Sequence, residues 1–229
     1  MTQELRDSWE EEAFKIFVAV YNAQFNRTRR AISGSVDHTV TTADADEIRR
    51  ALEELYRTEP NKVQPLVQRL FEDMADGVME ATIEEVARSV GDADALTAAI
   101  NSLTSTAART FATTMSESSL RLIYSIVESW RQTEGSTMAD LFRRMERTWK
   151  GQRPKAAAVT ETTRLYADTR IVTFESMGIE KFFINTREDD RVRSWHDEYA
   201  RESRRIGGYP LSRRDRVPPF TEKRDIGCR

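Results

Sequence analysis

Apolar residues recur at helical spacing through the first two-thirds of this chain. The first stripe consists of Leu5, Trp9, Phe14, Phe17, Tyr21 and Phe25. Positions three or four apart lie on one face of an α-helix, so each stripe can face a core. Only 9 glycines and 6 prolines occur among 229 residues, and this composition is unlike that of turn-rich sheet folds. The stripes therefore predict a bundle of about six helices over residues 1–150.

Prolines and short polar runs set the expected helix boundaries in this region. A helix capped by Thr42 should end before Pro60, because proline has no N–H to donate within a helix. The next helix then begins at Asn61. Further on, we expect one helix over residues 95–109 and a separate helix that starts at Ser116 and stops at Gly135. A Ser-Thr cap then opens a helix through Trp149.

The chain changes character near residue 150. A helix from Pro154 should end at Gly178, because glycine readily adopts the left-handed conformation that closes many helices. The aromatic and β-branched run IEKFFINT, residues 179–186, is the best strand candidate in the chain. Asp189 or Asp190 would cap the helix that follows, before glycines and prolines favour turns and extended chain.

These patterns predict a mainly α protein. We expect an N-terminal helical bundle over residues 1–150, followed by a small α+β domain with short strands over residues 151–229.

Cysteine use and hydropathy limit the classes of protein to which the chain can belong. Cys228 is the only cysteine, so neither an internal disulfide nor a zinc site of the CxxC type can form. The N-terminus is acidic and amphipathic, unlike a signal peptide, and no apolar run approaches the length of a membrane span. We therefore expect a protein that is neither exported by that route nor embedded in a membrane.

Charge is distributed unevenly. The net charge is -3, whereas residues 187–229 carry 12 Lys and Arg against 9 Asp and Glu, a local +3 that leaves -6 for the rest. Arginine pairs well with phosphates and carboxylates, so this end could contact DNA or an acidic protein surface. A solvated helix with internal ion pairs is the alternative. The candidate contact residues are Arg201, Arg204, Arg205, Arg213, Arg214 and Arg216.

A polar cluster is the main candidate for site chemistry, because common nucleotide-binding, protease, hydrolase and kinase motifs are absent. Asp190 and His196 offer a carboxylate and an imidazole, the groups that a metal ion or a general base requires. Six residues of helix would leave them on faces roughly 120° apart, unlike a ligand pair one turn apart. Three interpretations therefore remain. Asp190 could cap a helix while His196 packs beside it, Asp190 and His196 could bind a metal ion together with Cys228, or they could be catalytic. We expect no cofactor.

A second polar group lies in the middle of the predicted helix that begins at Pro154. Glu161 and Arg164 are three residues apart and could pair on its surface. Alternatively, Thr160, Glu161 and Thr162 face inward and hold the following strand and the Asp190 helix by hydrogen bonds. The residues leave both interpretations open.

The order of segments from Arg153 onward resembles the C-terminal domain of the Mu F-like minor head proteins, a phage head morphogenesis family. That family carries a helix with R-A-x-x-I-A-R-T-E, then G-[IV] and a short strand, the box T-x-D-x-R-V-R-x-x-H, a glycine-rich turn, a proline-containing segment and C-R-C. This chain offers RPKAAAVTETTRLYADTR, MGIEKFFINTREDDRVRSWH, RIGGYPL, VPPF and GCR in that order. The resemblance covers roughly the last third of the chain.

Carried over by position, the family's residues are Thr160 and Glu161, then Asp190, Arg191, Arg193 and His196, and finally Cys228 with Arg229. Val159 replaces the arginine expected before the Thr-Glu pair, and REDD lengthens the approach to the box. The sequence also stops one residue short of the family's last cysteine. If the native chain continues past Arg229, Cys228 and that neighbour could meet His196 as metal ligands.

The resemblance implies a structural, non-enzymatic minor head protein of a tailed bacteriophage. Such a protein is assembled in the host cytoplasm and resides in the virion, inside the capsid or at the portal vertex. It acts in head morphogenesis and in DNA packaging or ejection. The implied partners are the portal protein, the major capsid protein or packaged DNA, with several copies per particle. The alternatives are a metal-dependent nuclease or toxin-like effector built on Asp190, His196 and Cys228, and a DNA-binding module that uses the C-terminal arginines.

Overall fold

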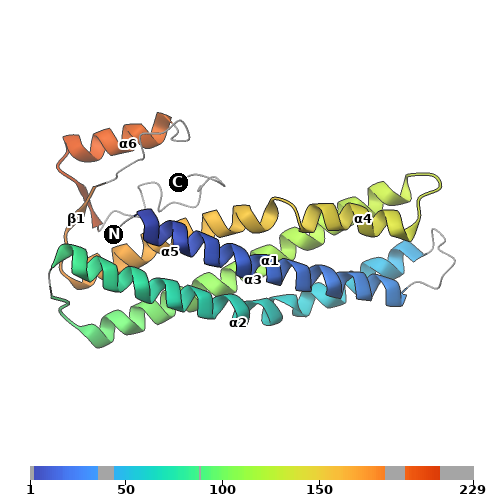
Figure 1. Cartoon of the computed structure of the whole chain (residues 1–229), viewed down its shortest axis with the longest axis horizontal. Helices are drawn as coiled ribbons and strands as arrows, with labels where there is room; N and C mark the ends of the chain where they lie inside the picture. The colour runs from blue at the N-terminus through green and yellow to red at the C-terminus, as the bar shows by residue number, and fades with distance from the viewer. Residues whose placement is uncertain (1–2, 36–43, 88, 184–193, 212–229) are drawn as a thin grey trace. The chain divides into compact units, whose positions relative to one another are not determined.

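The fold is mainly α, as predicted, and the described residues include one small antiparallel sheet (Figure 1). The computed structural model describes residues 3–35, 44–87, 89–183 and 194–211. In these residues the helices are α1 (Gln3–Ser35), α2 (Asp44–Val86), α3 (Ala93–Arg131), α4 (Met138–Trp149), α5 (Arg153–Ser176) and α6 (Ser194–Arg205). The strands are β1 (Lys181–Phe182) and β2 (Tyr209–Pro210).

The helix boundary predicted at Pro60 is wrong, because α2 continues through both Pro60 and Pro65. Each proline removes one backbone hydrogen bond, which costs about 3 kcal/mol or more in a helix interior. Packing offsets this cost. Buried residues continue at helical spacing on both sides of the prolines, and the buried Glu59 is bound by Arg27 of α1. The tertiary contacts thus hold a helix that local propensity would divide.

The predicted separation of residues 95–109 from the helix starting at Ser116 is also wrong, because α3 runs through both segments. The connecting residues look polar, but Phe111, Ala112 and Met115 are buried at helical spacing. Ser116 is buried as well. The apolar face of the helix is therefore continuous, and nothing in the segment forces a turn.

The chain divides into two compact units that are assembled from separate stretches. The first unit contains Met1–Ala13, Leu70–Ser105 and Ala156–Arg229, and the second contains Phe14–Arg69 and Thr106–Lys155. The boundary between Lys155 and Ala156 lies close to the predicted domain boundary at residue 150. The predicted boundary, however, divides the chain into two consecutive domains, whereas each observed unit combines separate stretches. The two predicted domains therefore stay a prediction.

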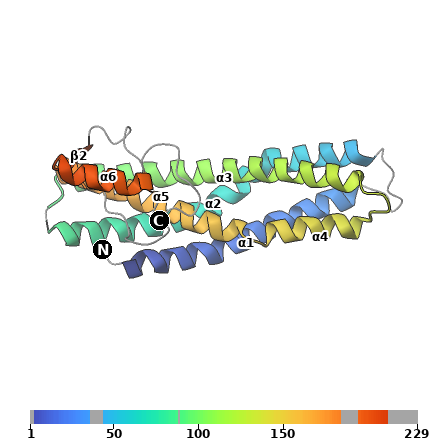
Figure 2. The same cartoon turned by 90° about the horizontal axis from the view of Figure 1, so that it is seen from above.

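The second unit is a helical bundle. Figures 1 and 2 both show the end of α1, the start of α2, the end of α3 and α4 running alongside one another. The ring of Phe17 on α1 stacks on that of Phe111 on α3, with 4.7 Å between centroids. Leu52, Ile123 and Leu141 are fully buried. Large apolar side chains from each helix thus form a shared core.

A capping box begins α4. The Thr137 side chain accepts a hydrogen bond from the Asp140 N–H at 3.3 Å, and the Asp140 carboxylate accepts one from the Thr137 N–H at 3.0 Å. These bonds satisfy backbone donors that an uncapped helix leaves free. The hydrogen bonds from Thr137 also lower the pKa of Asp140. The Ser-Thr cap expected here from the sequence is therefore confirmed.

We expect Thr137→Ala to lower the free energy of unfolding by about 1 kcal/mol, because Ala cannot cap the helix. Urea denaturation followed by circular dichroism measures this change. Thr97→Ala is the matched control, since the exposed Thr97 hydroxyl donates to the Ala93 carbonyl one turn back. An equal loss in both variants would contradict the capping role. A lowered Asp140 pKa stabilises the fold above the carboxyl's ordinary pKa, so the capping contribution should disappear as the pH falls through the folded-state value.

The described residues of the first unit include two apolar clusters. Ala75 on α2 packs with Leu96 and Ile100 on α3. On the same helix as Ala75, Gly77 allows close packing, because a Cβ there would lie 3.3 Å from Cζ2 of Trp9. The second cluster consists of Ile171, Phe182 and Leu211, with Phe174, Ile179 and Tyr209 packed against it. This second cluster joins α5 to the small sheet and positions the candidate site.

Candidate functional site

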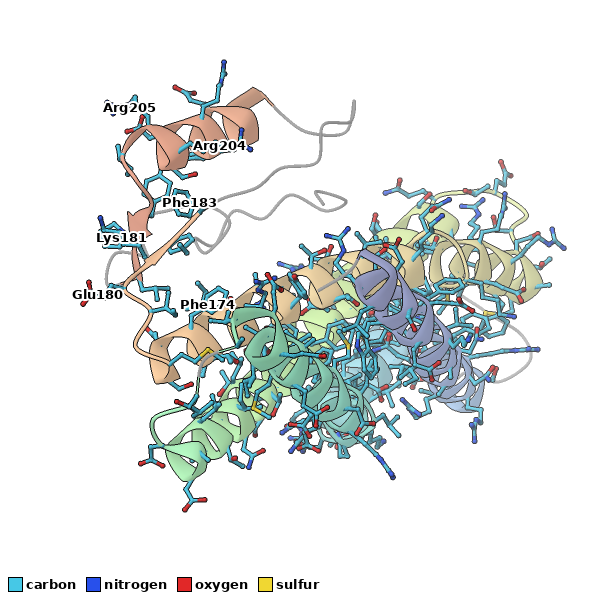
Figure 3. All side chains as sticks on the ribbon, turned by 60° about the vertical axis from the view of Figure 1, so that its left-hand side comes forward. Phe174, Glu180, Lys181, Phe183, Arg204 and Arg205 are labelled. Carbon is cyan, nitrogen blue, oxygen red and sulfur yellow. The ribbon has the colours of Figure 1, made fainter. Side chains whose placement is uncertain are left out.

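The C-terminal arm, residues 177–183 and 194–211, contains the described part of the resemblance. Gly178 closes α5 with a φ of +66°, as expected for the glycine after a helix. The strand predicted over residues 179–186 is confirmed at β1, which pairs antiparallel with β2. Phe182 lies opposite Tyr209 in this register, with ring centroids 6.0 Å apart. Figure 3 shows the arm with the side chains of Lys181, Phe183, Arg204 and Arg205 labelled.

Most of the predicted box falls outside the described residues. Asp190, Arg191 and Arg193 lie in the undescribed stretch 184–193, and Cys228 lies in the undescribed stretch 212–229. His196 is on α6, but its side chain is also outside the described set. The helix cap, metal and catalytic interpretations of these residues therefore stay predictions. Within the described part of the chain, no three possible metal ligands come together.

The Thr-Glu pair, Thr160 and Glu161, lies in the middle of α5. Thr160 and Glu161 are half-buried and Thr162 is buried. The hydroxyl oxygens of Thr160 and Thr162 are buried and have no hydrogen-bond partner among the described residues. Arg164 forms an ion pair with Asp168, with Nε and Oδ2 3.7 Å apart. The inward-facing interpretation of Thr162 therefore agrees with its burial, whereas its predicted link to the Asp190 helix concerns residues that are not described.

The arginines of α6 lie at the protein surface. Arg201, Arg204 and Arg205 are all exposed. Arg205 donates hydrogen bonds to both carboxylate oxygens of Glu202, at 2.8 and 2.7 Å. This contact lowers the pKa of Glu202 and keeps the carboxylate charged. Arg213, Arg214 and Arg216 lie beyond the described residues. The internal ion pair expected for a solvated helix is thus present, and contact of these arginines with DNA or a protein stays a prediction.

Arg170 on α5 is a site residue that the sequence did not indicate. Its guanidinium donates to the Tyr166 hydroxyl at 2.7 Å and to the Glu85 carboxylate at 3.1 Å. It also lies over the ring of Phe174, 5.1 Å from the centroid. Burial alone would lower the pKa of Arg170, but the contacts with Tyr166 and Glu85 outweigh it and raise the pKa. Arg170 thus stays charged and links α5 to α2 beside the arm.

The second unit contains a buried polar group that the sequence also did not indicate. The side-chain oxygen of Gln24 accepts hydrogen bonds from Ser119 Oγ at 2.8 Å and from Trp149 Nε1 at 3.1 Å. Arg153 donates to Ser119 Oγ at 3.2 Å, and its guanidinium lies 5.2 Å from the Trp149 ring centroid. Arg153 is the first residue of the segment that resembles the phage family. Its contacts explain why an arginine stands there, because it fastens the start of α5 to the bundle.

A second pair of buried polar contacts joins α1 to α2 nearby in the same unit. Arg27 forms a two-pronged ion pair with Glu59, whose side chain is fully buried. One turn away, the hydroxyl groups of Thr28 and Tyr56 are 2.9 Å apart. Burial raises the pKa of Tyr56, so its hydroxyl stays protonated at neutral pH. These contacts satisfy polar groups within the core and fix how α1 and α2 are aligned.

Comparison of the chain with protein-family models, with curated proteins and with solved structures gave no match. The resemblance to phage minor head proteins therefore rests on the order of the segments in residues 153–229 alone. None of the described helices is both long enough and apolar enough to cross a membrane.

Proposed function

We propose that the chain is a structural minor head protein of a tailed bacteriophage that acts at the portal vertex during head assembly and genome packaging or delivery. The observation that carries this proposal is the order of five separate sequence pieces from Arg153 to Arg229. The described order of α5, a closing glycine, β1, α6, a glycine turn and β2 agrees with the order expected of such a domain.

The surface of the second unit supports a docking role for the helices. Phe14 on α1 and Leu66 on α2 are 39% and 51% exposed, although most large apolar residues of these helices are buried. An exposed apolar side chain is stabilised when a partner covers it, at about 25 cal/mol for each Å² removed from water. The buried centre of a protein–protein interface is enriched in aromatic and other apolar side chains. We therefore propose that the portal protein binds at Phe14 of α1 and Leu66 of α2.

Binding to the portal protein encoded in the same genome tests the proposal. We expect the two proteins to elute together in size-exclusion chromatography after co-expression, and Leu66→Glu to weaken their association roughly tenfold, because a charge would be buried at the contact. Asn61→Glu is the matched control, since Asn61 is exposed on the same helix and the substitution adds the same charge.

Three results would contradict the proposal. The first is a chain that does not bind the portal or capsid protein and is absent from purified particles when these are analysed by mass spectrometry. The second is bound zinc or manganese at one ion per chain together with nuclease activity that His196→Ala abolishes, which would establish the enzymatic alternative. The third is binding to duplex DNA that weakens steeply with salt, without portal binding, which would establish the DNA-binding alternative.

A further inference from the structure

The outer edge of β1 is open in the part of the chain that the structure describes. The Leu211 N–H donates to the Glu180 carbonyl at 2.9 Å, and Phe182 lies opposite Tyr209. Hydrogen-bonded pairs alternate with non-hydrogen-bonded pairs along an antiparallel ladder. Lys181, which lies opposite Pro210, must therefore direct its N–H and C=O away from β2. These groups can accept another strand.

The outer edge of β2 cannot take part in the same way. Pro210 occupies the position whose backbone groups point outward, and proline has no N–H to donate. Proline in an edge strand blocks the addition of a further strand. A further strand can therefore be added to the small sheet at the β1 edge but not at the β2 edge. If the added strand belongs to a sheet whose other edge is also closed by proline, no more strands can follow.

A cation on β1 and an aromatic ring on the residue just after β1 lie two positions apart, at Lys181 and Phe183. Lys181 and Phe183 are exposed, Phe183 by 55%, whereas Phe182 between them is buried in the arm's apolar cluster. Figure 3 shows both exposed residues on the same short segment. Gly208 lies close to both, since a Cβ there would be 3.2 Å from Lys181 Cβ and 3.5 Å from Phe183 Cζ. Residues two apart in an extended chain lie on the same face of a sheet, so a neighbouring strand would meet Lys181 and Phe183 together.

This arrangement is complementary to itself. If two β1 strands pair antiparallel about a twofold axis at Phe182, each Lys181 lies directly opposite Phe183 of the other copy. A lysine ammonium is attracted to the face of an aromatic ring, so both cross-strand pairs are favourable. Their outward N–H and C=O groups then form main-chain hydrogen bonds. Centring the axis on Lys181 instead would place two lysines opposite each other, which is unfavourable.

We propose that the chain associates with a second copy of itself by antiparallel pairing of the two β1 strands, in the register that joins Lys181 to Phe183. The two small sheets become one sheet with the order β2-β1-β1-β2. Because Pro210 blocks both outer edges, the association stops at two copies. This interface is separate from the proposed portal-binding surface on α1 and α2, so either proposal can fail without the other.

Sedimentation velocity over a range of protein concentrations tests the pairing. We expect a monomer–dimer equilibrium, and Phe183→Lys should lower the association constant about tenfold or more, because two lysines then face each other twice. The double variant Lys181→Glu with Phe183→Lys should restore association, since each glutamate then faces a lysine. Lys62→Glu, at an exposed position of α2, should have no effect. Far-UV circular dichroism checks that every variant is folded.

Disulfide trapping tests the register. In a Cys228→Ser background, which removes the only native cysteine, Lys181→Cys and Phe183→Cys proteins are mixed and oxidised. Directly opposed residues of a hydrogen-bonded pair have Cα atoms about 5.5 Å apart, within the range of about 4.4–6.8 Å that a disulfide spans. We expect a mixed crosslinked dimer to predominate. A monomer at all concentrations, crosslinking of Lys181→Cys mainly to itself, or a double variant that stays dissociated would overturn the proposal.

Discussion

Arg27→Met should lower the free energy of unfolding by about 3–5 kcal/mol, because it leaves the carboxylate of Glu59 buried without its counter-charge. The Glu59 side chain is fully buried and that of Arg27 is 23% exposed, so solvent can replace the lost contacts only poorly. The pair also lies immediately before Pro60, where α2 lacks one backbone hydrogen bond. Urea denaturation monitored by circular dichroism measures the loss.

Two controls test whether the loss of stability comes from the burial of the ion pair rather than from the loss of any ion pair. Arg57→Met removes the ion pair with Glu54, whose side chains are 73% and 66% exposed, and should cost at most about 1 kcal/mol. The double variant Arg27→Met with Glu59→Met should regain much of the stability lost in Arg27→Met, because no buried charge remains. If Arg27→Met and Arg57→Met cost the same, the buried pair does not hold α1 to α2.

Trp149→Ala should lower the free energy of unfolding by about 3–5 kcal/mol, because it removes a fully buried aromatic side chain and leaves a cavity. The indole also donates a hydrogen bond to Gln24 and lies beneath the guanidinium of Arg153. Thermal denaturation and urea denaturation should agree on the loss. A change below 1 kcal/mol would mean that the bundle core does not depend on this residue.

Trp149→Phe separates packing from hydrogen bonding in the same position. It keeps an aromatic ring but removes the N–H, so the expected loss is smaller, about 1–2 kcal/mol, from the smaller ring and the lost hydrogen bond to the Gln24 oxygen, which keeps Ser119 as a donor. An effect as large as that of Trp149→Ala would show that the polar contact, rather than the volume of the ring, dominates. In Trp149→Ala, Arg153 also loses the ring that it lies over, whereas Trp149→Phe keeps a ring at that position.

Local patterns predicted the helical class and several element boundaries correctly. Phe17, Tyr21 and Phe25 of the first stripe are buried, Gly178 closes α5 and Thr137 caps α4. Phe14 of the same stripe is 39% exposed, because spacing tells which residues share a face and does not tell how far a neighbour covers that face. The predicted helix end before Pro60 was wrong for a related reason. The cost of a proline is local, whereas the packing that offsets it comes from residues distant in the sequence.

The candidate site was predicted in part. The strand at β1 and the exposed arginines of α6 agree with the sequence patterns. Arg170 and Arg153 were missed, because each binds partners on another helix, Glu85 of α2 for Arg170 and Ser119 of α3 for Arg153. A lone arginine in a helix carries no signal of such partners. The open edge of β1 was missed as well, since it depends on which residue of β2 stands opposite Lys181.

The sequence by itself determined that this protein is mainly helical, because side-chain periodicity and capping act over a few residues and need no knowledge of the rest of the chain. It also placed the glycine closure and the strand that follow α5. Only the tertiary structure decided that α2 and α3 are each continuous, that Arg27 and Glu59 meet, and that Lys181 faces outward from the sheet. Those outcomes depend on contacts between residues far apart in the chain, whose energies exceed the local preferences that oppose them.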